Sequence, residues 1–313
     1  MSQNAHKAIE LILSNVGSVI LGKDDAIKLV LSAWFSGGHV LIEDNPGTGK
    51  TVLAKCLARS VSVEFGRVQF TPDLLPSDVT GTTIYDEESR QFQFNRGPVF
   101  STIFLADEIN RATPRTQSAL LEAMAEFQVT ADKITYPLDP EFFVIATQNP
   151  IEQHGTFPLP EAQLDRFAMK ISMGYPNRQS EEEILKGRLS GDPFQRLKPV
   201  VRKEHIQEIK SAASQVKLSE ATLKYILDVV QKTREHPEIL LPASPRGALS
   251  LLKVSQAFTL ISGEDYIRPG TVYKLVPHIL GHRIGLTNEA RFQGRTKTDV
   301  LKSVLDSVKV PTR

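Results

Sequence analysis

The chain of 313 residues contains one cysteine, one tryptophan and no long apolar run. A single cysteine excludes an intrachain disulfide and a cysteine-rich zinc site. Residues 1–10 lack the apolar segment of a secretory signal. No window approaches the roughly 20 apolar residues that are needed to span a bilayer. We therefore predict a soluble, cytoplasmic protein without a membrane span.

The chain also lacks an excess of either charge, because 37 Lys and Arg residues are balanced by 36 Asp and Glu residues. This balance provides no general basic field for a nucleic-acid backbone, so nucleic acid is not the predicted partner. Hydrophobic residues make up 41% and charged residues 23% of the chain, which is close to ordinary globular usage. Disordered, collagen-like and disulfide-scaffold classes are excluded, and the length suits two domains.

The first half of the chain alternates short apolar runs with helical patterns. Such alternation predicts a parallel sheet flanked by helices. The predicted strands are residues 40–42, 67–70, 103–106, 142–147 and 167–173. The predicted helices are residues 50–61 and 114–126. The second helix has Thr113 in position to cap it and Pro114 at its first helical position.

The pattern changes near residue 178. Beyond it the sequence has helical periodicity and few strand signals, and residues 180–183 have the form of a capping box. The predicted helices are residues 181–189, 203–213, 219–234, 245–261, 269–280 and 296–308. We therefore predict an α/β domain over residues 1–178 and a smaller all-α domain over residues 179–313.

A glycine-containing loop separates the first apolar strand from the helix at 50–61. It reads Asp44-Asn45-Pro46-Gly47-Thr48-Gly49-Lys50-Thr51. This is the setting of a Walker A loop, whose backbone N–H groups surround phosphates at a helix N-terminus. Lys50 would contact the β- and γ-phosphates, and the Thr51 hydroxyl would bind Mg²⁺. We predict ATP binding from Asp44 to Val52. An ordinary strand-to-helix turn is the alternative, and it leaves the Gly-Lys-Thr ending unexplained.

Two carboxylates, Asp107 and Glu108, follow the apolar strand at 103–106. We place this strand beside the strand of the phosphate loop, so that both tips open onto one crevice. Asp107 would then hold Mg²⁺, and Glu108 would orient and deprotonate the attacking water. The alternative for an isolated Asp-Glu pair is a strand end that meets solvent.

Two more polar residues stand next to predicted strands. Asn149 follows the strand at 142–147, where its side chain could hydrogen-bond the lytic water and sense the γ-phosphate; the alternative is a turn-forming residue before Pro150. Arg166 precedes the strand at 167–173. It is either an arginine finger for a neighbouring subunit's ATP or the partner of Asp165 or Glu161 in a salt bridge.

A third candidate, Arg246, lies in the first turn of the predicted helix at 245–261, with Ser244 as the cap. The helix dipole disfavours a cation at this position. The pattern therefore indicates a partner for Arg246, and either a nucleotide phosphate or an acidic side chain would serve.

Together these segments resemble the MoxR group of AAA+ ATPases. The resemblance covers about residues 5 to 290, and its motifs are residues 41–51, 107–124, 146–152, 155–167 and 243–246. MoxR-like proteins often carry Asp where Asp44 stands, and we expect its carboxylate to point away from phosphate or to hydrogen-bond within the turn. The resemblance implies a helical lid and a homo-oligomeric ring, usually of six subunits, with Mg-ATP at each boundary. It also implies Arg166 as the finger and Arg246 as sensor 2.

Two inserted hairpins are implied as well, at residues 81–97 and 128–138. In the group such inserts line the pore of the ring or face a client, and a surface hairpin without a contact role is the alternative. The adenine pocket is expected near residues 19–22, where plain core packing would explain the same apolar residues.

The resulting functional hypothesis is a chaperone-like machine that uses ATP to assemble or activate a client. The clients of the group often contain a von Willebrand factor A domain or belong to a metal-containing complex. A DNA-directed motor and the motor subunit of a metal chelatase are alternatives from related proteins. A nucleotide switch with little turnover is disfavoured because Glu108 and Arg166 are both present.

Overall fold

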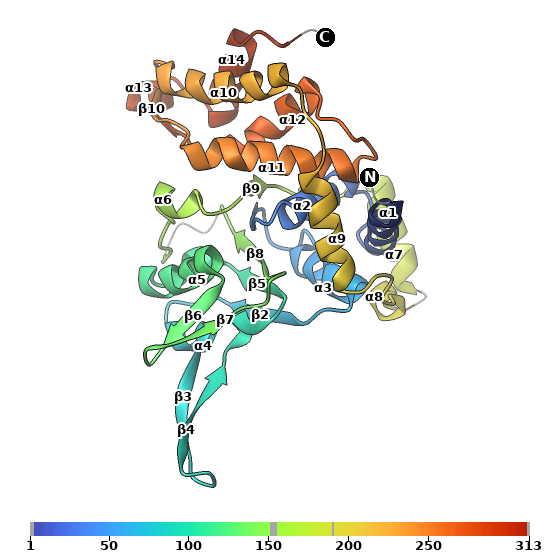
Figure 1. Ribbon diagram of the computed structural model, residues 1–313, viewed down its shortest axis with the longest axis vertical. Helices are drawn as coiled ribbons and strands as arrows, with labels where there is room; N and C mark the ends of the chain where they lie inside the picture. The colour runs from blue at the N-terminus through green and yellow to red at the C-terminus, as the bar shows by residue number, and fades with distance from the viewer. Residues whose placement is uncertain (1–2, 151–154, 190, 312–313) are drawn as a thin grey trace.

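The computed structural model describes residues 3–150, 155–189 and 191–311. Its centre is a five-stranded parallel sheet with the order β2-β5-β8-β1-β9 (Figure 1). The strands are β1 Val40–Glu43, β2 Phe65–Gln69, β5 Ile103–Asp107, β8 Phe143–Gln148 and β9 Met169–Ile171. β1, β5 and β8 are buried along almost their whole length, because helices cover both faces of a parallel sheet. All five predicted strands are confirmed, with small shifts at their ends.

The predicted strand order is wrong at one place. β5, which carries Asp107 and Glu108, pairs with β2 and β8, and β8 separates it from β1. The two tips still open onto the same side, because parallel strands have their carboxyl ends at one edge of the sheet. The intervening strand β8 places Asn149 between the phosphate loop and the carboxylates.

The helices of the α/β half include the two that the sequence predicts, with identical bounds. They are α1 Gln3–Gly17, α2 Asp24–Phe35, α3 Lys50–Val61, α4 Pro76–Thr80, α5 Pro114–Glu126 and α6 Glu161–Leu164, with the 3-10 turns η1 Pro98–Phe100 and η2 Ile109–Arg111. Thr113 stands at the N-cap of α5, but its side chain makes no capping hydrogen bond. Pro114 is the first helical residue, as predicted.

The described residues of the C-terminal half form helices, one short ladder and an isolated bridge between Lys217 and Tyr266. Its helices are α7 Arg178–Leu189, α8 Pro193–Arg196, α9 Glu204–Ser214, α10 Glu220–Glu235, α11 Pro245–Ile261, α12 Pro269–Leu280, α13 Asn288–Phe292 and α14 Lys297–Ser307, and the ladder joins β10 Ile239–Leu241 to β11 Gly285–Leu286. The six predicted helices are confirmed to within three residues. The capping box at 180–183 is wrong, because α7 begins earlier and the Ser180 N–H donates to Asn177 Oδ1 at 2.8 Å.

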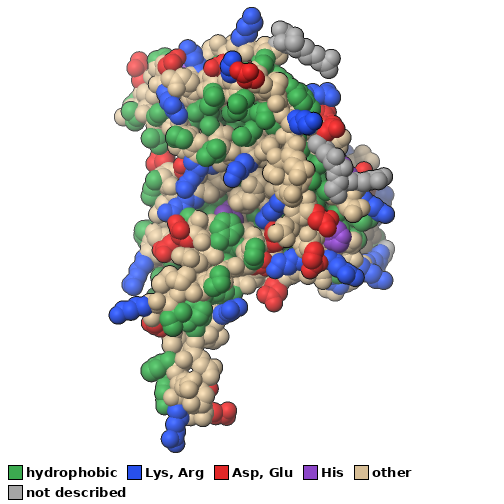
Figure 2. Space-filling view, in the orientation of Figure 1, with side chains coloured by type: hydrophobic (Ala, Val, Ile, Leu, Met, Phe, Trp, Pro, Cys, Tyr) green, Lys and Arg blue, Asp and Glu red, His purple; other side chains and the backbone are tan. Residues whose placement is uncertain are grey.

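Both predicted hairpins are present. The first joins β3 Gly81–Asp86 to β4 Gln91–Arg96, and the second joins β6 Gln128–Ala131 to β7 Ile134–Pro137. The rings of Phe94 and Tyr136 stack with centroids 4.2 Å apart, so the two hairpins are in contact. Figures 1 and 2 show the β3–β4 hairpin projecting far from the body of the molecule.

One buried apolar cluster runs through both halves, from α1 and α2 to α11, α12 and α14. Cys56 is completely buried in this cluster, and burial raises the pKa of its thiol to about 12, as a structural thiol requires. The packing is continuous across residue 178, so the domain boundary stays a prediction. None of the described helices combines the length and the apolarity of a bilayer-crossing segment. The cytoplasmic location also stays a prediction.

Candidate functional site

The phosphate loop connects the carboxyl end of β1 to the first turn of α3. Gly47 and Gly49 have left-handed backbones, with φ of 82° and 90°, which favour glycine. Open space surrounds the position of a Cβ at both residues. The Lys50 ammonium donates to the carbonyl oxygens of Asp44 at 2.7 Å and Asn45 at 3.1 Å. These carbonyls hold the ammonium where anionic oxygens could replace them as acceptors. Burial lowers the pKa of Lys50, and the nearby carboxylates oppose this shift.

The Asp44 side chain points away from the loop. Its carboxylate accepts hydrogen bonds from Ser172 Oγ at 2.7 Å and from the backbone N–H groups of Met173 and Gly174. Of the two arrangements expected for Asp44, the structure has the one in which the carboxylate points away from the phosphate site. Its hydrogen bonds reach the segment after β9 and not the turn of the loop. Asp44 therefore ties the loop to the end of β9, and its side chain is not part of the cavity wall.

A cavity of about 420 Å³ lies over the loop at the carboxyl edge of the sheet. Its wall consists of Pro46, Gly47, Thr48, Gly49, Lys50, Thr51, Val52, Arg67, Gln69, Asp107, Glu108 and Asn149. The structure thus brings together the predicted phosphate loop, the predicted Mg²⁺ ligands Thr51 and Asp107, and the candidates Glu108 and Asn149. Residues 151–154 of the motif after β8 lie outside the described part of the chain.

The carboxylate of Asp107 is held by two neighbouring strands. Thr147 Oγ1, on β8, donates to Asp107 Oδ1 at 2.7 Å, and the guanidinium of Arg67, on β2, pairs with Oδ2 at 2.9 Å. The side chain of Asp107 is 14% exposed. An oxygen ligand held at the edge of this cavity has the chemistry that Mg²⁺ prefers.

Glu108 has a left-handed backbone with φ of 57°, a conformation that costs about 1–3 kcal/mol and is common at functional sites. Its N–H donates to Thr147 Oγ1 at 2.8 Å. Its carboxylate accepts from Gln69 Nε2 at 2.8 Å and from Arg111 at 2.9 Å. Arg67, Gln69, Arg111 and Thr147 are not among the site residues that the sequence predicts. Arg67 and Gln69 become candidates only once β2 is known to pair with β5.

A second cavity of about 300 Å³ adjoins the first and shares Gly47, Thr48, Gly49 and Val52 with it. Val19, Ile20 and Leu21 form one wall, as expected for an adenine pocket, and Ile184 of α7 and Pro193 lie opposite. Gly22 does not line it. A Cβ at Gly22 would stand 2.2 Å from Ser180 Oγ, so glycine allows α7 to close this apolar pocket. The flat face of an adenine ring can pack against such apolar walls.

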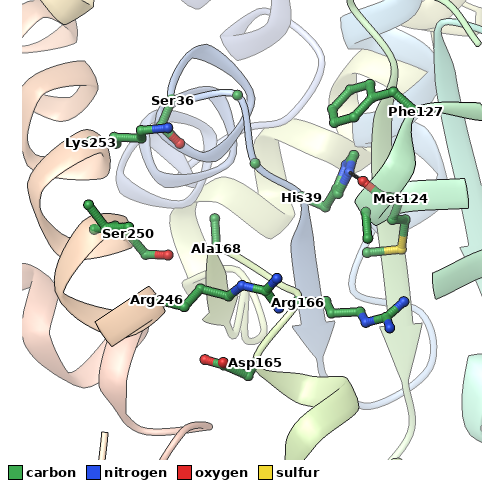
Figure 3. Close-up of a pocket in the computed structure, with 14 residues that line it drawn as sticks. Ser36, His39, Met124, Phe127, Asp165, Arg166, Ala168, Arg246, Ser250 and Lys253 are labelled. Atoms are coloured by element: carbon green, nitrogen blue, oxygen red, sulfur yellow. Dashed lines mark hydrogen bonds between the residues drawn. The ribbon is translucent and has the colours of Figure 1, made fainter. Parts of the chain in front are cut away.

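Arg166 and Arg246 lie elsewhere. Both line a separate cavity of about 350 Å³ between α11 and the α/β half, together with Lys253 (Figure 3). Neither lines the cavity over the phosphate loop. Arg166 donates to the carbonyl oxygen of Leu121 at 2.5 Å. Asp165 forms its ion pair with Arg283, so the salt bridge between Asp165 and Arg166 that the sequence left open is not formed.

Arg246 extends from the first turn of α11 toward Arg166 (Figure 3). Ser244 caps the helix through a bond from the Gly247 N–H, as predicted. Within the described residues, the Arg246 side chain has no hydrogen bond or ion pair. Of the two partners that the sequence allowed for Arg246, an acidic side chain is therefore not the one it has within the described residues.

His39 also lines the cavity that contains Arg166 and Arg246. One ring nitrogen, Nδ1, accepts from the Val144 N–H at 3.1 Å, and Nε2 lies 3.1 Å from the carbonyl oxygen of Met124. Burial lowers the pKa of His39 to about 4. The ring is therefore neutral at pH 7 and connects β8 to the end of α5.

Comparisons with known proteins agree with this geometry. Residues 39–169 match the ATPase family associated with various cellular activities (AAA), and residues 231–304 match the AAA lid domain. The chain is 44% identical to the uncharacterized protein YeaC of Bacillus subtilis, over 99% of this chain and 97% of that protein. It is 38% identical to Chaperone MoxR1 of Mycobacterium tuberculosis, over 97% of this chain and 82% of that protein.

Two further comparisons extend over almost the whole chain. The protein MoxR of Methylorubrum extorquens is 30% identical, over 95% of this chain and 93% of its own length. The crystal structure of a candidate ATPase from Cytophaga hutchinsonii superposes with a TM-score of 0.91 at 40% identity, over 98% of this chain and 96% of that one. With its AAA domain, its lid and its phosphate-loop cavity, the chain belongs to the MoxR family of AAA+ ATPases.

Proposed function

We propose that this ATPase hydrolyses Mg-ATP to ADP and phosphate at the boundaries between its subunits, and that hydrolysis drives the remodelling of a client protein. One observation carries the proposal. The phosphate loop, Asp107, Glu108 and Asn149 line one cavity, whereas Arg166 and Arg246 line another. The two sets can act on one nucleotide when the arginine-bearing cavity of one subunit faces the phosphate loop of the next, as in a ring of six.

The chemistry follows from the cavity over the loop. The N–H groups around Gly47 and Gly49 and the ammonium of Lys50 bind the phosphates. Thr51 and Asp107 would hold Mg²⁺, which neutralises the charge that develops on the phosphate oxygens. Asn149 orients a water for in-line attack on the γ-phosphorus. Glu108 accepts the proton of that water as the bond from phosphorus to the ADP oxygen breaks.

Glu108 must be released from its present partners before it can accept a proton. Its carboxylate accepts hydrogen bonds from Gln69 and Arg111, and donors to a carboxylate favour its charged, unprotonated form and occupy its lone pairs. We infer that this arrangement is the resting state of the site, and that a bound nucleotide and a docked neighbour shift Glu108 toward the water.

The arginines of the neighbouring subunit complete the site. Arg166 and Arg246 would stabilise the negative charge on the transferring phosphoryl group, an effect worth roughly 10³- to 10⁵-fold in rate for arginine fingers. Both line one cavity, and Lys253 adds a third cation to its wall. The triphosphate chain of ATP, which is negatively charged, matches these cations.

The client-facing surface in this proposal is the β3–β4 hairpin. Tyr85 and Phe92 face each other across the two strands with ring centroids 5.3 Å apart, and they are 52% and 75% exposed. Ile84, on the opposite face, is 50% exposed. Exposed apolar groups on a protruding element mark interaction sites. The name of the relative Chaperone MoxR1 supports a client-remodelling role, and clients with a von Willebrand factor A domain are the kind that the family resemblance implies.

The DNA-directed alternative has less support. On the face in Figure 2, Lys and Arg side chains are interspersed with Asp and Glu side chains along the body, and the formal net charge is +1. A backbone-binding surface concentrates positive charge and loses affinity steeply with salt. Salt-dependent binding of duplex or single-stranded DNA by the wild-type protein would revive this alternative.

The test of the shared site is the variant Arg166→Ala. We expect it to bind a fluorescent ATP analogue with the wild-type Kd, because Arg166 does not line its own phosphate-loop cavity, while ATP turnover falls by roughly 10³-fold. The control is Arg234→Ala, which removes an exposed arginine from α10 and should turn over at the wild-type rate. Wild-type turnover by Arg166→Ala would overturn the proposal.

A further inference from the structure

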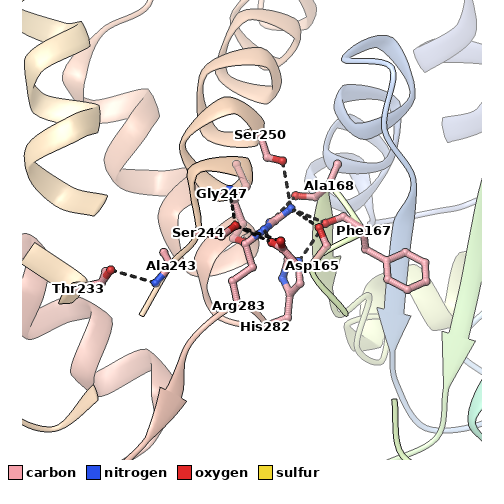
Figure 4. A network of polar contacts seen from close by, with 11 residues as sticks. Asp165, Phe167, Ala168, Thr233, Ala243, Ser244, Gly247, Ser250, His282 and Arg283 are labelled. Carbon is pink, nitrogen blue, oxygen red and sulfur yellow. Dashed lines mark hydrogen bonds and ion pairs between the residues drawn. The ribbon is translucent and has the colours of Figure 1, made fainter. Parts of the chain in front are cut away.

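Arg283 is a buried cation that the proposed chemistry does not use. It follows α12, and its side chain is 1% exposed. Its Nε donates to Asp165 Oδ1 at 2.8 Å. Its two terminal nitrogens donate to backbone carbonyls, among them those of Phe167 at 2.7 Å and Ala168 at 3.2 Å. The segment that carries Arg166 is therefore fastened on both sides by one guanidinium (Figure 4).

The same ion pair also holds α11, the helix of Arg246. Arg283 donates to Ser250 Oγ at 3.0 Å, and Ser244 Oγ donates to the carboxylate of Asp165 at 3.0 Å. Ser244 stands two residues before Arg246, and Ser250 stands one helical turn after it. Figure 4 shows Arg283 between α11 and the strand-forming segment, with both serines directed toward the pair.

The packing around the pair leaves little room for adjustment. A Cβ added at Gly247, next to Arg246, would stand 3.2 Å from the Cδ atom of Arg283. Burial lowers the pKa of Arg283, and the carboxylate of Asp165 opposes this shift. A buried guanidinium that binds one carboxylate and several carbonyl oxygens is held in a fixed position. Losing the carboxylate would leave its buried charge unpaired.

We propose that Asp165 and Arg283 are positioning residues that fix Arg166 and Arg246 relative to each other, so that the two arginines approach the nucleotide of the neighbouring subunit as one rigid unit. This inference rests on the proposed function. The lid thereby contributes to catalysis in the next subunit through a contact that touches neither the nucleotide nor the water. Misplacing a catalytic group by about 1 Å can cost roughly 10²-fold in rate.

The test uses Asp165→Asn, which keeps the shape of the side chain and an acceptor for Arg283 but removes the charge. We expect kcat to fall 10- to 100-fold, up to roughly the cost of misplacing a catalytic group by about 1 Å. The Kd for a fluorescent ATP analogue should be unchanged. Mixing this variant with Lys50→Ala subunits should restore turnover, because the Lys50→Ala chain supplies correctly held arginines to the intact phosphate loop of the variant. Failure of the mixture to recover would overturn the positioning role.

Asp139→Asn is the matched control. Asp139 pairs with Lys203 at 2.6 Å and is 11% exposed. This pair also joins the α/β half to the start of a C-terminal helix, α9, but neither residue lines the cavity of the two arginines. The control should lose thermal stability and keep its kcat. If Asp139→Asn and Asp165→Asn lowered kcat equally, the loss would reflect general destabilisation and the proposal would fail.

A double variant separates this inference from the proposed function. Asp165→Asn should not slow turnover further in an Arg166→Ala background, whereas an additional loss as large as that of the single variant would contradict positioning through Arg166. If Arg166→Ala itself turned over at the wild-type rate, the shared site would fail. If Arg166→Ala were inactive and Asp165→Asn fully active, only the positioning role would fail. Arg283→Lys, which keeps the charge and loses the planar fork, should show the same loss as Asp165→Asn and the same recovery.

Discussion

Replacing Glu108 by glutamine isolates its proposed role as the base. The amide has nearly the shape of the carboxylate, and its oxygen can still accept from Gln69 or Arg111, which hold the present side chain at 2.8 and 2.9 Å. The backbone bond from the Glu108 N–H to Thr147 does not involve the side chain. We therefore expect the cavity to keep its form and to bind ATP with a Kd within about threefold of wild type, a difference below 1 kcal/mol.

The chemical step should be lost. General base catalysis contributes roughly 10²- to 10⁴-fold, which corresponds to about 3 to 5.5 kcal/mol of barrier. Single-turnover phosphate release with saturating ATP measures this step, and binding of a fluorescent ATP analogue measures the Kd. Lys50→Ala serves as the contrast, because it should lose binding itself. Glu208→Gln, an exposed position on α9, is the neutral control. Phosphate release by Glu108→Gln at the wild-type rate would refute the assignment of the base.

Three further outcomes are expected. Gln69→Ala removes one of the two donors that hold Glu108, so basal turnover should rise a few-fold in steady-state assays; a fall would mean that Gln69 aligns Glu108 for catalysis. The pKa of His39 is about 4 in the fold, below its value of about 6.5 in an unfolded chain. Its contribution to the free energy of unfolding, about 3 kcal/mol, is therefore present above pH 6.5 and lost as the pH falls toward 4. His39→Gln should therefore flatten the decline of Tm between pH 6.5 and 4, and an unchanged slope would contradict the burial argument. Tyr85→Ser with Phe92→Ser should leave basal ATPase activity intact and abolish binding of casein, an unfolded probe; retained casein binding would exclude the hairpin as a client site.

Four of the long helices are predictable to the residue because their periodicity and their terminal signals agree. α3, α5, α11 and α12 have the predicted bounds to the residue, and three of them begin with proline. The sequence does not predict the short elements α8, α13, β10 and β11, since two to five residues give no measurable period. The cap of α7 was misassigned because two capping residues, Asn177 and Ser180, stand three positions apart and only the fold selects one.

The site was predictable where its residues adjoin in sequence, and not where tertiary structure brings them together. The phosphate loop and the Asp107-Glu108 pair are local motifs. The order of the strands is set by crossover connections, so the sequence could not place β8 between β1 and β5. For the same reason the sequence does not reveal that Arg67 and Gln69, on β2, bind the carboxylates of Asp107 and Glu108. The location of Arg246 in the same cavity as Arg166 depends on how α11 packs on α2 and α9.

The central claim is that each active site is built from two subunits, and mixing two inactive variants tests it most directly. Lys50→Ala subunits lack the phosphate-binding cation and keep Arg166, whereas Arg166→Ala subunits keep the phosphate loop. In a 1:1 mixture that exchanges subunits freely, about one quarter of the head-to-tail boundaries in a closed ring combine an intact loop with an intact arginine. We predict that this mixture recovers ATP turnover at about one quarter of the wild-type rate. Turnover no higher than that of either variant alone would contradict a site shared between subunits.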